Sequence, residues 1–202
     1  MPSARLQSWD YANEGMYFIT ICTGNRDCYF GQIVCSVETP CMASQNNPVT
    51  PYQMQLSDIG KIAAEEWVKT IELRPDMNLE LGEYVVMPNH VHGIIMIGEN
   101  QHNDGGGNGS RDAMHRVSTT RTDPEPSNKF GPQRKNIGSI MRGYKSAVTT
   151  WARKNDVPFA WQTRFHDHII RSAEEYERIS DYIRNNPAKW GEDRFYNPSR
   201  PS

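Results

Sequence analysis

Residues 84–97 read YVVMPNHVHGIIMI, and the proline in the middle of this apolar run restricts how the chain can fold. Proline fixes φ and cannot donate a hydrogen bond to a β-ladder, so Pro88 and Asn89 are predicted to form a tight turn. The residues on either side have the composition of strands. The sequence therefore predicts two strands, over 78–87 and 90–97, joined directly at this turn.

A strand and a helix are predicted before this pair. Residues 15–23, GMYFITICT, mix β-branched and aromatic residues and end at the turn-forming Gly24 and Asn25, which is typical of a strand. A helix is predicted over 57–72, where Ser57 can cap the first turn. The apolar residues of this helix recur at helical spacing: Ile59, Ile62, Ala63, Trp67 and Ile71.

A helix, a strand and a last helix are predicted after the pair. A second apolar stripe indicates a helix over about 136–154, and RFHDHIIR at 164–171 is typical of a strand. The final helix is predicted over 172–187, where Ser172 and Glu175 have the spacing of a capping box. The order of elements is therefore βαββαβ followed by one more helix.

This order predicts an α+β fold of the ferredoxin-like, or split βαβ, type. Such a fold has a four-stranded antiparallel sheet with helices on one face, and here a C-terminal helix is added. We expect one domain over 1–202. Residues 38–55 lack a clear period and are predicted to form a loop. Residues 98–133 are too polar and too rich in Gly and Pro to bury a core, so they are predicted to form a flexible insertion.

The composition is that of a globular protein with one core, since 37% of the 202 residues are hydrophobic and the net charge is −2. No apolar stretch has the roughly 18–20 residues that a membrane span needs, and no signal peptide is evident. We therefore expect a cytoplasmic protein without a membrane partner. The four cysteines lack zinc-site spacing and are predicted to be reduced thiols.

Positive charge is concentrated between residues 134 and 171, where eight basic residues stand against two acidic ones. The local charge is +6, although the net charge argues against a simple polyanion binder. This segment is either an ordinary solvated surface or a surface that contacts a nucleic-acid backbone.

His90 and His92 are one residue apart in a predicted strand, so both project from the same face of the sheet. Two neighbouring imidazoles in a half-buried sheet would repel each other if charged and would need partners if neutral. A divalent metal between them would satisfy both nitrogens. The alternative is two unrelated histidines that are hydrogen-bonded to neighbours.

Tyr182 and Asn186 are four residues apart and so share one face of the last helix. The amide oxygen can ligate a metal, and the phenol can approach a phosphate that the metal polarises. Tyrosine has an ordinary pKa near 10, so it needs such help to act as a nucleophile at neutral pH. The alternative is that Tyr182 belongs to the apolar stripe of its helix, with Tyr176, Ile179 and Ile183.

Three segments in this order, MPNHVHGIIMI, WQTRFHDHIIR and EYERISDYIRNNPAKW, resemble the single-tyrosine HUH transposases of the insertion-sequence 200 type, particularly the REP-associated tyrosine transposases. The resemblance runs from the first strand to about Trp190. It implies that His90 and His92 are the metal-binding histidines on either side of Val91, and that Tyr182 is the nucleophile. Asn186 takes the position of a polar third metal ligand, which is often glutamine in relatives.

The resemblance further implies cleavage of single-stranded DNA through a 5′-phosphotyrosine intermediate, followed by strand transfer, with Mg²⁺ or Mn²⁺ as the metal. Relatives act on palindromic hairpins, either as dimers that exchange the tyrosine helix or as monomers, so both a monomer and a homodimer are expected here. DNA contacts are predicted within the positive segment, at Arg142, Lys145, Arg164 and Arg171.

Two other functions fit the same residues. A nucleic-acid-binding module that has lost cleavage would keep this fold, and a metal-dependent hydrolase would use the histidines without Tyr182. Within the enzyme interpretation, His166 and His168 form a rival histidine pair, and Tyr144 is an alternative nucleophile, although it lies in the apolar stripe of its helix.

Overall fold

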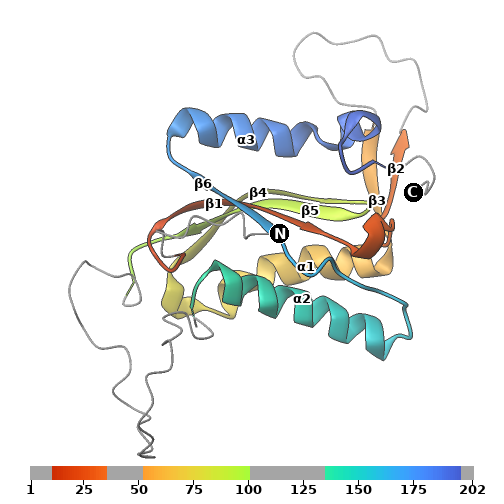
Figure 1. Cartoon of the computed structure of the whole chain (residues 1–202), viewed down its shortest axis with the longest axis horizontal. Coiled ribbons are helices and arrows are strands. Elements are labelled where there is room, and N and C mark those ends of the chain that lie inside the picture. The colour runs from red at the N-terminus through yellow and green to blue at the C-terminus, as the bar shows by residue number, and fades with distance from the viewer. Residues whose placement is uncertain (1–10, 36–51, 101–134, 197–202) are drawn as a thin grey trace, which may run out of the picture.

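A computed structural model of the chain describes residues 11–35, 52–100 and 135–196. Its centre is a four-stranded antiparallel sheet in the order β4-β5-β1-β6. The strands are β1 (Gly15–Cys22), β4 (Leu79–Met87), β5 (His90–Ile97) and β6 (His166–Ile170). Figure 1 shows α1 (Asp58–Glu72) and α2 (Ile137–Lys154) against one face of the sheet, and α3 (Ala173–Asn185) across the other. The predicted α+β fold is confirmed.

The helices begin where the sequence places capping residues. The Ser57 side chain accepts a hydrogen bond from the Gly60 N–H at the start of α1, and the Ser172 side chain accepts one from the Glu175 N–H at the start of α3. Glu175 does not complete the predicted box at the cap itself, because its carboxylate accepts from the Arg171 N–H, one residue earlier, at 2.9 Å. The Ser172 side chain alone therefore caps the helix, and it satisfies one N–H group of the first turn.

Two short strands were not predicted. β2 (Gly31–Cys35) and β3 (Tyr52–Leu56) form a separate antiparallel pair, so the predicted loop over 38–55 is wrong for its last residues. In β3 the glutamines are exposed, while Met54 and Leu56 are half-buried. Five residues with this weak alternation carry little strand signal in the sequence. The remainder of that loop, 36–51, lies outside the described residues.

Three short 3-10 helices complete the described elements: η1 (Gly24–Arg26), η2 (Pro75–Met77) and η3 (Pro187–Glu192). η3 follows α3 after Asn186 and extends the chain beyond the end of the predicted last helix. Residues 101–134, which include most of the predicted insertion, lie outside the described residues. Among the helices that the structure describes, none is long and apolar enough to cross a membrane. Cys22, Cys28 and Cys35 are free thiols.

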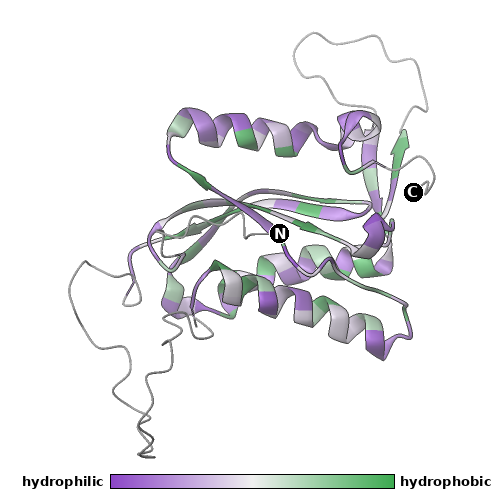
Figure 2. Cartoon of the chain, in the orientation of Figure 1, coloured by the Kyte–Doolittle hydropathy of each residue, from purple (hydrophilic) through white to green (hydrophobic). Residues whose placement is uncertain are grey.

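The core lies on both faces of β5 and β1. Facing α1 and α2, the buried side chains include Tyr17, Ile19, Val91, Ile95 and Trp67. Facing α3, a smaller cluster is formed by Ile94, Ile170, Ile179 and Ile183. Figure 2 shows polar residues along most of α3, with a few apolar ones between them, as expected for a helix that buries one side. Because β5 is covered on both faces, it reads as a nearly continuous apolar run instead of an alternating one.

Gly93 lies where Trp67 of α1 packs tightly against the sheet. A Cβ at this position would overlap the indole of Trp67 and would lie 3.0 Å from the Cβ of Tyr84. Trp67 is fully buried, so its ring has no room to move away. We predict that Gly93→Ala destabilises the protein by about 1–3 kcal/mol, measured by urea unfolding. Gly191→Ala is the control, because a Cβ there meets nothing within 4 Å; equal stability of both variants would contradict this packing.

Candidate metal centre and tyrosine site

The two histidines lie side by side at the start of β5, directly after the turn formed by Pro88 and Asn89. Both are almost completely buried, and their ring centroids are 4.4 Å apart. Their strand neighbours on β1 are Cys22 and Thr20, respectively. The predicted same-face arrangement is therefore present, and it faces α3 instead of α1 and α2.

The hydrogen bonds of Asn89 and His90 determine which nitrogen of His90 carries the proton. The amide nitrogen of Asn89 donates to the carbonyl oxygens of Arg26 and Phe195, so its Oδ1 is an acceptor. His90 Nδ1 lies 2.9 Å from that Oδ1 and must donate to it. The other ring nitrogen, Nε2, then carries a lone pair, and this atom is buried without a hydrogen-bond partner among the described residues. Such a nitrogen is suited to a metal ion.

His92 is held between two hydroxyl groups. Its Nδ1 lies 2.8 Å from Thr20 Oγ1, and its Nε2 lies 3.2 Å from the Tyr182 hydroxyl. Both hydroxyls can donate or accept, so these two contacts fit either neutral tautomer of His92. In both histidines Nδ1 thus contacts a supporting side chain, and in His90 Nε2 carries the lone pair.

Burial keeps both imidazoles neutral. It lowers the pKa of His90 well below its usual range, and the charges of His92, Arg194 and Arg26 act in the same direction. It also lowers the pKa of His92 to about 3, with a further contribution from Arg194. At neutral pH both rings are therefore in the form that binds metals.

Asp193 supplies an acidic group that the sequence did not single out. One of its carboxylate oxygens and one ring nitrogen of each histidine lie within 4.8 Å of one another. Asp193 comes after η3, where no periodicity exists and where the adjacent Glu192 has the same chemistry. Asp193 and Glu192 differ only in the folded structure, where the chain brings Asp193 close to the histidines.

Asn186, the predicted third ligand, is buried at the end of α3, and its Oδ1 has no hydrogen-bond partner within the described ranges. Two imidazole nitrogens, a carboxylate and an amide oxygen suit a divalent ion such as Mg²⁺ or Mn²⁺. Of the buried side-chain atoms that lack a hydrogen-bond partner among the described residues, His90 Nε2 and Asn186 Oδ1 belong to this site. They favour an ion here, because buried polar atoms ordinarily have partners.

Tyr182 does not belong to the apolar stripe of α3. Ile179 and Ile183 are buried, whereas Tyr182 is 42% exposed and contacts the rings of His92 and Phe18. Burial and the charge of Asp193 raise its pKa, while a side-chain hydrogen bond from Asn186 and the charge of Arg194 act in the opposite direction. The phenol is therefore neutral, accessible and directed at the histidine pair.

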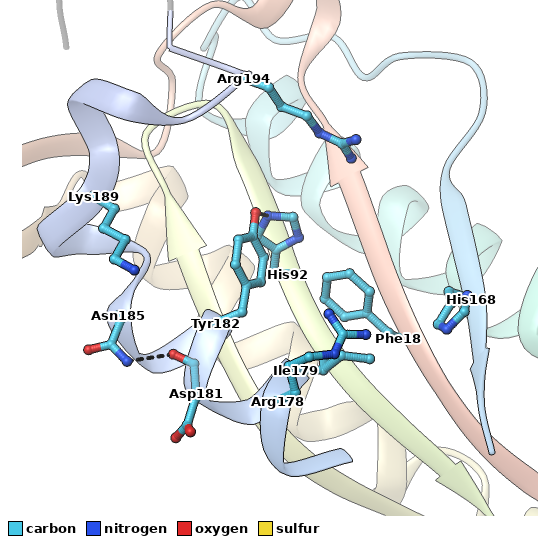
Figure 3. Close-up of a pocket in the computed structure, with 10 residues that line it drawn as sticks. All are labelled: Phe18, His92, His168, Arg178, Ile179, Asp181, Tyr182, Asn185, Lys189 and Arg194. Atoms are coloured by element: carbon cyan, nitrogen blue, oxygen red, sulfur yellow. Dashed lines mark hydrogen bonds between the residues drawn. The ribbon is translucent and has the colours of Figure 1, made fainter. Parts of the chain in front are cut away.

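An open pocket of about 720 Å³ lies in front of these side chains (Figure 3). Tyr182 and His92 form part of its wall, and Arg194 extends toward it from the chain that follows η3. A second pocket of about 280 Å³ adjoins it and is lined by Asn186 and Asp193. Tyr182, Asn185, Lys189 and Arg194 line both pockets.

The four basic residues predicted to contact DNA do not line these pockets. Arg142 and Lys145 are on α2, across the sheet from α3 (Figure 1). Lys145 donates to the Gln162 carbonyl at 2.5 Å and lies over the Trp161 ring. Arg164 precedes β6 and Arg171 follows it. The basic residues of the larger pocket are instead Arg178, Lys189 and Arg194, which are too scattered in the sequence to form a visible cluster.

The rival candidates have structural partners. The Tyr144 hydroxyl donates to the Ala63 carbonyl at 3.0 Å inside the core, and burial raises its pKa. His168 Nε2 lies 2.7 Å from Glu175 Oε1, on the edge strand β6. Tyr144 is therefore a core residue, and His168 belongs to the rim of the pocket instead of the histidine pair.

The neutral buried histidines predict a pH-dependent stability in the absence of metal. Their pKa values are lower in the folded than in the unfolded chain, so their contribution is complete above about pH 6.5 and is lost as the pH falls toward 3. When the pH is lowered from 7.5 to 5, each imidazole should decrease the free energy of unfolding by about 2 kcal/mol. Urea unfolding with a chelator present measures this. His92→Gln should show a shallower dependence, and a flat wild-type profile would contradict neutral burial.

The oxygen ligands can be tested by metal affinity. We predict that Asp193→Asn weakens Mn²⁺ binding about tenfold or more, because it removes the only charge among the proposed ligands but keeps the shape. Asn186→Ala should also weaken it. Calorimetric titration measures both, and Asp181→Asn, a carboxylate change in the adjoining larger pocket, is the control. Wild-type affinity in Asp193→Asn would remove Asp193 from the site.

Comparison with known proteins gives a relative and a structural neighbour. No protein-family model matches this chain. An uncharacterized protein of Haemophilus influenzae (strain ATCC 51907 / DSM 11121 / KW20 / Rd) is 35% identical over 195 residues, which cover 96% of this chain and 92% of that protein. The solved structure of a REP-associated tyrosine transposase bound to a REP hairpin has a TM-score of 0.51 and 18% identity, and the match covers 95% of this chain and 75% of that one.

The structural similarity extends through the sheet and its helices, and at this identity it establishes a shared fold. The chain has a transposase-like fold, and it belongs to the same family as the Haemophilus influenzae protein.

Proposed function

We propose that this protein cleaves single-stranded DNA with Tyr182, holds the 5′ end as a phosphotyrosine, and passes it to another strand. The observation that carries this proposal is the 3.2 Å contact between the Tyr182 hydroxyl and Nε2 of His92, one of two buried neutral imidazoles. The likeness in fold to a tyrosine transposase that was solved with a DNA hairpin supports the same substrate class.

The reaction requires a phosphodiester and no external energy source. The Tyr182 oxygen forms a bond to phosphorus, and the bond from phosphorus to the 3′ oxygen breaks. The phenol loses a proton and the departing 3′ oxygen gains one, so charge and atoms balance. Since one ester is exchanged for another, attack by a 3′-hydroxyl on the phosphotyrosine reverses the step and joins strands.

His90, His92, Asp193 and Asn186 would hold the divalent metal that we propose as cofactor, Mg²⁺ or Mn²⁺. When bound, such an ion neutralises charge on a phosphate and orients it for in-line attack. The protein contributes the positions of the ligands. Asn89 fixes the tautomer of His90, Thr20 contacts Nδ1 of His92, and the ends of α3 and η3 bring the amide and the carboxylate.

The shape of the site favours an extended strand. The pocket beside Tyr182 is open, and its wall carries three basic side chains and the aromatic Phe18. A single strand can bring its backbone to such a surface more readily than a duplex can. The sheet face that RNA-recognition domains use for stacking bases is covered here by α3, which disfavours that mode of binding (Figure 1).

One chain supplies the histidines, the tyrosine and both oxygen ligands. This supports a monomer as the working unit, although a homodimer that exchanges α3 would place the same groups together. The residues of the positive segment, Arg142, Lys145, Arg164 and Arg171, remain proposed contacts for DNA beyond the pocket.

The test is incubation of the protein with Mn²⁺ or Mg²⁺ and a pool of labelled single-stranded hairpin DNA, followed by denaturing gels. Wild type should form a covalent adduct, and His90→Ala should not. Tyr182→Phe should lose the adduct by a factor of about 10³ or more because it lacks the nucleophile, yet it should still bind metal. Tyr196→Phe, a change at another exposed tyrosine, should keep the adduct.

Each other outcome selects a different function. An adduct that survives in Tyr182→Phe would show that another residue is the nucleophile. Metal binding and DNA binding without any adduct would favour the nucleic-acid-binding module. Release of cleaved DNA by Tyr182→Phe would favour the metal-dependent hydrolase.

A further inference from the structure

The three basic side chains of the larger pocket differ in how their charge is balanced. Arg178 forms an ion pair with Glu175 at 3.6 Å. Arg194 and Lys189 line both pockets, and no carboxylate in the described parts of the chain lies within 4.0 Å of either charge. An unbalanced cation at a pocket that adjoins a nucleophile is available for an anionic ligand.

The backbone around Arg194 is anchored by Asn89, in the turn that precedes the histidines, and by Arg26. Asn89 donates from Nδ2 to the Phe195 carbonyl at 2.9 Å, and Arg26 donates to the Arg194 carbonyl at 3.1 Å. The Phe195 N–H donates to Asp193 Oδ1 at 2.6 Å. Phe195 itself is buried against the His90 ring, with centroids 4.6 Å apart. Arg194 therefore projects from a fixed base, although its side chain is exposed.

The guanidinium is also oriented. Its carbon lies 4.5 Å from the centroid of the Phe195 ring, and Figure 3 shows the side chain extending toward the pocket that contains Tyr182 and His92. A group placed in this way before a substrate arrives loses little freedom when the substrate binds.

We propose that Arg194 binds the scissile phosphate beside Tyr182 and stabilises the negative charge on its non-bridging oxygens during strand transfer. Guanidinium is planar and stays protonated, and it can donate two parallel hydrogen bonds to a phosphate. It exchanges no proton with the substrate. This role rests on the proposed function, and it identifies the residue that recognises the phosphodiester.

The rate of adduct formation in a single turnover tests the role. Arg194→Ala should form the Tyr182 adduct about 10²–10³-fold more slowly than wild type, as when one preorganised donor is removed from a developing negative charge. Arg194→Lys should fall between them, because it keeps the charge but loses the fork. Added guanidinium, far below denaturing concentrations, should restore part of the rate in Arg194→Ala and should leave wild type unchanged.

The matched control is Arg184→Ala. Arg184 is also an arginine of the C-terminal part, but it pairs with Glu83, Glu177 and Asp181 and does not line the larger pocket. Its loss should leave the rate within a factor of about two. Arg194→Ala should keep the Mn²⁺ affinity and the melting temperature of wild type, because an exposed guanidinium neither ligates the ion nor fills the core.

The contrary outcomes are separable. If wild type forms the adduct and Arg194→Ala forms it equally fast, the role of Arg194 is overturned and the proposed function stands. A slow variant that also loses Mn²⁺ affinity and does not respond to guanidinium would show that Arg194 merely supports the structure. If wild type forms no adduct, the proposed function fails, and the assigned role fails with it.

Discussion

The side-chain alternation of β5 is the constraint on which the rest of this structure depends. β5 lies inside the sheet, between β4 and β1, and helices cover both of its faces. Val91 and Ile95 pack toward α1 and α2, whereas His90, His92 and Ile94 face α3. A slip of one residue in the pairing would place the imidazoles in the larger core and the aliphatic residues against α3. Hydrophobic burial on both faces therefore fixes the position of the histidines.

Burial also determines the chemistry of the histidines. A charged imidazole in this position would lose its hydration without gaining a carboxylate in close contact, so both rings are neutral. A neutral imidazole presents one lone pair, which is unfavourable in an ordinary core unless it has a hydrogen-bond partner. His90 Nε2 and Asn186 Oδ1 are both buried without a hydrogen-bond partner among the described residues. A bound ligand accounts for this better than core packing does.

Asn89 connects the two halves of the site. It forms the turn with Pro88, accepts from His90, and holds the carbonyl of Phe195, more than one hundred residues later in the chain. The carbonyl of Asn89 in turn accepts from the backbone and side chain of Thr23. One buried amide thus ties the end of β1, the start of β5 and the segment that carries Asp193 and Arg194. The tight turn that the sequence predicted has a second role as the anchor of the segment that carries Arg194.

The sequence by itself determined the sheet, the three helices and the residues that repeat with a local period. The spacing of His90 and His92 predicted a shared strand face, and the spacing of Tyr182 and Asn186 predicted a shared helix face; both reflect backbone geometry within a few residues. Periodicity predicted α1, α2 and α3, while the short strands β2 and β3 escaped because five weakly alternating residues carry little signal.

Only the tertiary structure decided what surrounds these residues. Asp193 and Arg194 follow the last helix without any period, and they reach the histidines because Asn89 and Arg26 anchor that segment. Likewise, the four basic residues that were predicted to contact DNA, on α2 and beside β6, do not line the pocket, whereas basic residues scattered in the sequence do. Local geometry is encoded by neighbours in sequence, but a site made of separate segments depends on long-range packing.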